Sequence, residues 1–149
     1  MENLNNLHLT EGDDWHFETQ CTRCNEKEEN VIYFNLVEKE KIEGSKGEAN
    51  YIAKCKFCEM KGNIEYCNNS LRQYSKNEQW QTIAIFECRN IEITRFVPGN
   101  QMKAQGTGGD GDSFFDDIDL STEPDWAGYD ESADCAVGVY DFKSQVIRS

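Results

Sequence analysis

Two pairs of cysteines with C-x-x-C spacing are the residues of this sequence best suited to chemistry. They are Cys21 with Cys24 and Cys55 with Cys58. Two intervening residues let the chain turn so that both sulfurs of a pair face one ion, and two such pairs place four thiolates at the corners of a tetrahedron. Sulfur ligands favour zinc over magnesium or calcium. The sequence therefore predicts one structural Zn²⁺ bound by Cys21, Cys24, Cys55 and Cys58, with no coordination position left for a reacting water.

Basic residues gather around these pairs, although the chain as a whole is short of them. Lysine or arginine occupies five positions in or beside the two pairs, namely Arg23, Lys27, Lys54, Lys56 and Lys61. Each can offset the negative charge of a four-thiolate zinc site or lower the pKa of a thiol. A thioredoxin-type redox pair would instead need C-x-x-C at the start of a helix within a βαβ pattern, which this sequence lacks.

Three further cysteines, Cys67, Cys88 and Cys135, stand outside the pairs. We expect them to be small buried apolar residues, because free cysteine is among the most buried residue types. One alternative is a thiol-redox enzyme of the methionine sulfoxide reductase type, with Cys88 or Cys135 as the nucleophile. Such a nucleophile needs a base, and His8 and His16 are the only histidines. A second alternative is a metal-handling protein that uses the spare thiols.

Three other patterns carry less weight. Residues 106–111 match G-x-G-x-x-G, but no strand pattern leads directly into them and no helix pattern follows, so we reject a dinucleotide site. The acidic run 110–119 is interpreted as a solvated loop. Aromatic residues near the C-terminal end could line a peptide groove, although packing within a small β-domain is the simpler interpretation; they are Trp126, Tyr129, Tyr140 and Phe142. We predict no catalytic residue and no cofactor-binding residue.

The elements that must position the cysteines are strands. Short apolar runs separated by turn residues predict an all-β fold, a small sandwich or barrel-like domain with two zinc knuckles. The predicted strands cover residues 15–20, 31–37, 51–53, 63–67, 82–88, 91–97 and 136–142. The range 82–88 is apolar on both faces, which is typical of a central strand. A short helix is expected near 121–129, and glycines with polar residues predict a flexible loop at about 98–113.

Length and charge limit the function further. The chain has 149 residues, which predicts a single domain over 1–149. Its 28 acidic and 15 basic residues give a net charge of −13, which opposes binding to nucleic acid or to an anionic membrane. No apolar run is long enough to span a membrane and no secretory signal is evident, so we expect a cytoplasmic or nuclear protein.

Several segments in order resemble one known family. They are TQCTRCNE, YIAKCKFCEMKGNIEY, FECRNIEITRFVPG, FFDDIDL and DWAGYDESADCAVGVYDF. From about Leu4 to Phe142 the chain is similar to the CXXC-motif-containing zinc-binding protein family of eukaryotes. That resemblance implies an all-β fold and zinc ligation by Cys21, Cys24, Cys55 and Cys58. The family pattern has glycine after the first pair where this chain has Asn25, and asparagine tolerates the left-handed conformation expected there.

These observations favour a non-enzymatic zinc-binding protein that acts by docking to a protein partner. The four-cysteine site leaves no open coordination position, and no catalytic constellation is evident. An acidic surface favours a partner with a basic face, through steering more than through raw affinity. The identity of that partner and the oligomeric state do not follow from the sequence.

Overall fold

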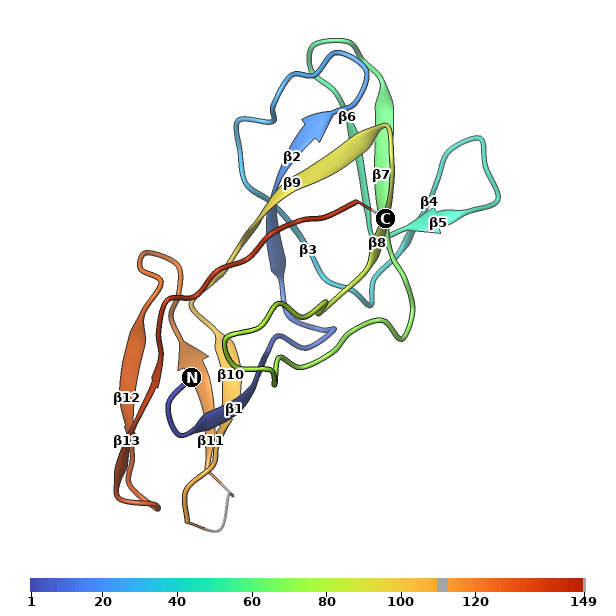
Figure 1. Cartoon of the computed structure of the whole chain (residues 1–149). Coiled ribbons are helices and arrows are strands. Elements are labelled where there is room, and N and C mark those ends of the chain that lie inside the picture. Colours follow the sequence, from blue (N-terminus) through green and yellow to red (C-terminus); the bar gives the residue numbers. More distant parts are fainter. Residues whose placement is uncertain (110–112, 149) are drawn as a thin grey trace. The chain divides into compact units, whose positions relative to one another are not determined.

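The computed structural model of the chain describes residues 1–109 and 113–148. Within these residues there are thirteen strands and no helix, which confirms the all-β prediction (Figure 1). The strands are β1 Leu4–His8, β2 Trp15–Cys21, β3 Ile32–Phe34, β4 Glu40–Lys41, β5 Glu48–Ala49, β6 Tyr51–Lys54, β7 Lys61–Tyr66, β8 Phe86–Arg89, β9 Ile91–Val97, β10 Met102–Gly106, β11 Phe114–Ile118, β12 Trp126–Asp130 and β13 Cys135–Val139. A search of the described residues finds no helix long and apolar enough to cross a membrane.

The chain forms two compact units, each assembled from segments that are distant in the sequence. The first unit comprises Met1–Leu9, Arg72–Ile83 and Pro98–Lys143. The second unit comprises Thr10–Leu71, Ala84–Val97 and the residues from Ser144 onward. Whether both fold together as the single domain predicted over 1–149 stays a prediction.

The second unit is built around an aromatic cluster. It contains the sheets β3-β2-β9 and β6-β7-β8 and the small hairpin β4-β5. Along β2 the side chains alternate between buried and half-buried, as in a strand with one face on the core. The ring of Phe86 in β8 lies 5.3 Å from that of Phe17 in β2 and 6.0 Å from that of Tyr66 in β7. Aromatic contacts therefore join the two sheets whose strands lead into the cysteine pairs.

The first unit contains the sheets β1-β10-β11 and β12-β13. Its core is made of small and medium apolar side chains: Leu4, Leu7, Met102, Ala104, Ile118, Leu120, Val137 and Val139. One buried carboxylate, Asp130, lies among them. Its Oδ1 accepts a hydrogen bond of 2.6 Å from the Ser113 hydroxyl and one of 3.2 Å from the Ala133 amide. The first bond connects the end of β12 to the residue before β11, and the second lies within the turn between β12 and β13.

Two predicted elements of this unit are wrong. The loop predicted at 98–113 contains β10, in which Met102, Ala104 and Gly106 are buried and alternate with more exposed residues. The alternation is a strand signal, but lysine, alanine and glycine concealed it because they have low β-propensity. Residues 110–112 of that loop, part of the predicted acidic run and of the G-x-G-x-x-G pattern, lie outside the described residues. The helix expected near 121–129 is absent, and Trp126–Asp130 is a strand instead.

The predicted central strand at 82–88 is also wrong. The structure forms a strand only over Phe86–Arg89, and β8 lies at the edge of its sheet with mostly exposed residues. The preceding residues make separate bonds, since the amide of Cys67 donates to the Ile85 carbonyl and that of Arg72 donates to the Ile83 carbonyl. The boundary between the two units also lies between Ile83 and Ala84.

Substitution of Gly106 provides a test of the packing around Asp130. A Cβ at Gly106 would lie 2.5 Å from Asp130 Oδ2 and 3.0 Å from the Ser113 Cβ. We expect Gly106→Ala to lower the free energy of unfolding by about 2 kcal/mol, because overpacking displaces buried groups. A Cβ at Gly99 would meet nothing within 4 Å, so Gly99→Ala is the matched control. Equal denaturant midpoints for the two variants would contradict the expectation.

Candidate metal centre

The four paired cysteines come from the ends of strands in the second unit. Cys21 is the last residue of β2, and Cys24 lies in the turn that follows. Cys55 directly follows β6, and Cys58 lies in the turn that leads to β7. The structure brings their sulfurs together, and all four lie within 4.8 Å of one another. The cluster therefore joins one end of the sheet β3-β2-β9 to one end of the sheet β6-β7-β8.

The spacing of the sulfurs suits tetrahedral coordination of a metal. The Sγ atoms of Cys21 and Cys58 are 3.6 Å apart, as are those of Cys24 and Cys55. A tetrahedron with metal–sulfur bonds of about 2.3 Å has sulfur–sulfur edges of about 3.8 Å. The observed separations, from 3.6 to at most 4.8 Å, bracket that value. Four thiols with this spacing can hold one tetrahedral ion.

The two turns have the same backbone hydrogen bonds. In the first turn, the amide of Asn25 donates to the Cys21 carbonyl at 3.1 Å, and the amide of Cys21 donates to the Glu26 carbonyl at 3.0 Å. The second turn repeats both bonds at 3.0 and 2.9 Å, from Glu59 to Cys55 and from Cys55 to Met60. Each pair is thus held by a closed turn that exists independently of the other pair.

Each turn also places one residue in the left-handed region of backbone conformation. Asn25 has φ of 63°, and Glu59, at the equivalent position of the second turn, also has φ of 63°. The conformation expected for Asn25 is confirmed. Glu59 was missed, because glutamate gives no local signal for a positive φ, and only its equivalence to Asn25 could have indicated it. An L-residue other than glycine pays about 1–2 kcal/mol for this conformation.

Backbone amides within the turns favour ionised sulfur. The amides of Cys24 and Arg23 point at the Cys21 sulfur and lower the pKa of that thiol to about 6. Amides of Cys58 and Phe57 likewise lower the pKa of the Cys55 thiol. For Cys24, the Glu26 amide lowers the pKa, but burial and the neighbouring thiols raise it, to about 12 in total. Amides thus support a thiolate in each turn, while full ionisation of the cluster requires a cation.

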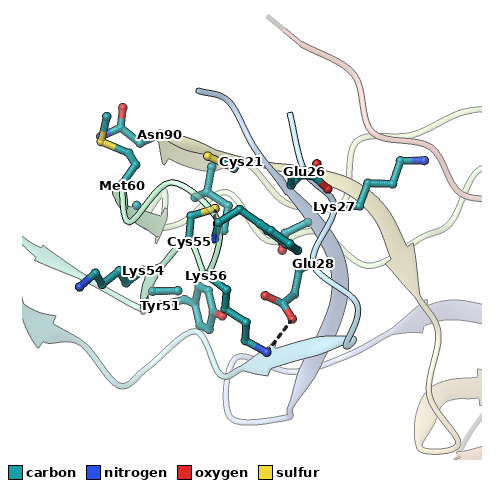
Figure 2. A pocket seen from close by; sticks show the side chains of 15 residues that line it. Cys21, Glu26, Lys27, Glu28, Tyr51, Lys54, Cys55, Lys56, Met60 and Asn90 are labelled. Atoms are coloured by element: carbon teal, nitrogen blue, oxygen red, sulfur yellow. Dashed lines mark hydrogen bonds and ion pairs between the residues drawn. The ribbon is translucent and has the colours of Figure 1, made fainter. Parts of the chain in front are cut away.

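A hollow lies beside the cluster and is shown in Figure 2. We call it the knuckle hollow; its lining includes Thr19, Cys21, Lys27, Tyr51, Lys54, Cys55, Lys56, Phe57 and Met60. The Lys56 ammonium lies 3.8 Å from the Glu28 carboxylate, so that one wall carries an ion pair. The Phe57 side chain is 60% exposed. The Thr19 hydroxyl is buried and has no hydrogen-bond partner among the described residues.

The other cysteines lie apart from the cluster. The prediction that all three are buried is wrong for Cys88, which is exposed because β8 is an edge strand; Cys67 and Cys135 are half-buried. Desolvation raises the pKa of the Cys88 thiol. His8 Nδ1 lies 2.5 Å from the Asn6 carbonyl oxygen, and the ring of His16 is 5.6 Å from that of Tyr33.

The aromatic residues named as possible groove residues do not share one face. Trp126 lies over Gly128, since a Cβ at Gly128 would meet the indole at 2.6 Å, and its ring is 6.1 Å from that of Phe115. Tyr129 is 52% exposed, on the other face of β12. Tyr140 lies across Gly138, where a Cβ would approach its ring to 2.4 Å. A common groove lined by Trp126 and Tyr129 is therefore excluded.

Comparison with known proteins agrees with the geometry. A family model described as "CXXC motif containing zinc binding protein, eukaryotic" matches residues 1–147. The chain belongs to this family. It is 36% identical to a UPF0587 protein of Nematostella vectensis and 34% identical to the CXXC motif containing zinc binding protein of Bos taurus; each alignment covers 99% of this chain and 92% of the relative. The crystal structure of C1orf123 is similar with a TM-score of 0.83 and 34% identity, covering 93% of this chain and 87% of that one.

Relief of the strained turn at Glu59 tests the second knuckle. We expect Glu59→Gly to raise the free energy of unfolding by about 0.5–1 kcal/mol, because glycine adopts a positive φ without the steric cost but loses more entropy on folding. Asn25→Gly should raise the free energy of unfolding by a smaller amount, since asparagine tolerates a positive φ better than glutamate does. Thermal unfolding of both variants beside the parent measures the difference. Destabilisation by Glu59→Gly would contradict the expectation and show that the Glu59 side chain contributes more to stability than its backbone strain costs.

Proposed function

We propose that this member of the family is a non-enzymatic protein in which one structural Zn²⁺ joins two knuckles, and that it acts by docking to a protein partner. The observation that carries the proposal is the cluster of Cys21, Cys24, Cys55 and Cys58, with sulfurs at tetrahedral separations. Thiolate ligands in that geometry suit zinc. Bound there, the ion would supply folding free energy, because the site does not exist in the unfolded chain.

The closed ligand set supports a structural role. With four protein ligands, a tetrahedral ion keeps no position for water or substrate, whereas catalytic zinc keeps one. The ion would also connect the end of β2 to the turn between β6 and β7, and these strands belong to different sheets. A metal bound there would hold the sheets β3-β2-β9 and β6-β7-β8 together at the ends that carry the cysteines.

The remaining thiols favour this interpretation over a thiol-redox enzyme. A reactive cysteine has a lowered pKa, next to a cation, a histidine or a helix N-terminus. The pKa of the Cys88 thiol is instead raised by desolvation, and acidic neighbours such as Glu92 and Glu87 raise it further. A raised thiol pKa supports the interpretation of Cys88 as a non-catalytic cysteine.

The knuckle hollow supports docking to a partner. Phe57 exposes an aromatic ring at the turn that also carries Cys55 and Cys58. Phenylalanine and methionine, both present in this hollow, are enriched in the cores of protein interfaces. Apolar and basic groups thus meet beside the cluster.

Metal counting on the purified protein tests the zinc site. We expect one zinc per chain, released only on unfolding, and we expect four cysteines to resist a thiol-blocking reagent until then. Cys55→Ser should lose the metal and leave the second unit unfolded or the protein insoluble. Cys88→Ser, at an exposed thiol outside the cluster, is the control and should keep the metal. Full zinc content in Cys55→Ser would refute the four-cysteine site.

Substitution of Phe57 tests docking. Immobilised protein should capture a partner from a eukaryotic extract at low and at physiological salt, and Phe57→Asp should abolish that capture because it removes the exposed apolar anchor. Val37→Asp is the matched control, since Val37 is 62% exposed in the same unit but does not line the hollow. Equal capture by both variants, or capture of nothing by the parent at either salt concentration, would count against the docking role.

A further inference from the structure

The outer edge of β12 is an open strand edge. Within the described residues, β12 pairs with β13 on one side and with no strand on the other. Its five residues pair in continuous register with β13, from Trp126 opposite Val139 to Asp130 opposite Cys135. An open edge presents backbone donors and acceptors that can pair with a further strand.

The contacts of β13 show which backbone groups of β12 point outward. Gly138 both donates to and accepts from the backbone of Glu2, at 3.0 and 2.7 Å. Its amide and carbonyl therefore point away from β12, so that its pairing with Ala127 is of the type without hydrogen bonds. Because antiparallel pairs alternate between the two types, the pair of Tyr129 with Ala136 is of the same type.

A second contact supports this assignment. The Asn3 side-chain amide donates to the Ala136 carbonyl at 2.8 Å, so that this carbonyl too points away from β12. The backbone amides and carbonyls of Ala127 and Tyr129 are therefore directed to the outer edge. Both residues are exposed, and no hydrogen bond from these backbone groups occurs within the described part of the chain.

The segment of the chain that carries this edge is strongly acidic, and Lys143, which follows it, pairs with Asp141. Between Lys103 and Lys143 the sequence contains eleven acidic residues and no lysine, arginine or histidine. Three exposed carboxylates flank the strand closely, namely Glu123, Asp125 and Glu131. A second copy of this chain would bring the same negative charge to the edge and would be repelled. A strand with basic side chains would be attracted.

We propose that the outer edge of β12 binds an extended basic segment of a partner protein as an added β-strand. Ala127 and Tyr129 would pair with its backbone, as in other cases of strand addition. Arginine or lysine at alternate positions would lie on the solvent face, beside the Tyr129 ring and the flanking carboxylates. This inference rests on the proposed docking function and assigns to it a second surface with its own partner chemistry.

Amide hydrogen exchange on the full chain tests the proposal directly. The probe is a peptide of about seven residues with alternating threonine and arginine. Without peptide, the amides of Ala127 and Tyr129 should exchange fast and that of Gly128 slowly. Saturating peptide should slow the exchange of Ala127 and Tyr129 by about tenfold or more. Unchanged exchange at both amides, or protection confined to the edge of β11, would overturn the proposal.

Single substitutions distinguish β-strand pairing of the peptide from its nonspecific electrostatic attraction to the acidic chain. Ala127→Pro removes an outward amide but no bond to β13, and should weaken peptide binding by about tenfold or more. Glu131→Lys should weaken it several-fold, whereas Glu11→Lys, the same charge change in the other unit, should not. Equal losses in both lysine variants would overturn the proposal, and so would binding of an alternating threonine–glutamate peptide with equal affinity. If the peptide does not bind but capture that depends on Phe57 is observed, the strand-addition proposal is refuted and the proposed docking function is not.

Discussion

Repulsion between four crowded thiolates is the constraint on which the second unit depends. Sulfurs within 4.8 Å of one another cannot all ionise in a small volume unless a cation lies among them. Amides of the two turns favour charge on Cys21 and Cys55, which reduces the cost of ionisation for one sulfur of each pair. The neighbouring lysines are exposed to solvent, so a metal ion bound among the sulfurs would neutralise the rest of the charge more effectively. The sheets that carry the two pairs approach each other at this cluster.

The aromatic cluster around Phe86 acts on the same two sheets by different physics. Apolar burial is non-directional and tolerates small shifts of one sheet over the other. Metal coordination by sulfur fixes distances and angles. The backbone strain at Glu59 is one cost of this fixed geometry, since the turn has to present two sulfurs to the same point. Apolar packing thus provides most of the contact area between the two sheets, and a metal bound by the cysteine cluster would fix their relative position.

Local patterns made the cluster predictable and made parts of the first unit unpredictable. The spacing within each cysteine pair is a property of four consecutive residues, and the regular alternation of β2 places it at nearly its observed bounds. The strand β9 was also predicted at its observed bounds, although its alternation is less regular. In contrast, β10 pairs with β1, a strand distant in the sequence, and Gly106 fits closely beside Asp130, so neither contact can be found from a local pattern. The strand β12 likewise depends on its pairing with β13. Exposure of Cys88 depended on the sheet order, which no local pattern contains.

The equivalence of the two turns has a kinetic consequence. Each half of the ligand set belongs to a different sheet and closes its own turn, so that a lone half would bind a metal only as a two-coordinate chelate. The affinity for the metal would rise when the fold holds both cysteine pairs close together. The second pair then binds the ion at a high effective concentration, as in a bivalent ligand. Departure of the ion then requires the sheets to separate. Metal exchange would accordingly follow the opening rate of the second unit, and a radioactive or isotopic tracer would report on its conformational dynamics.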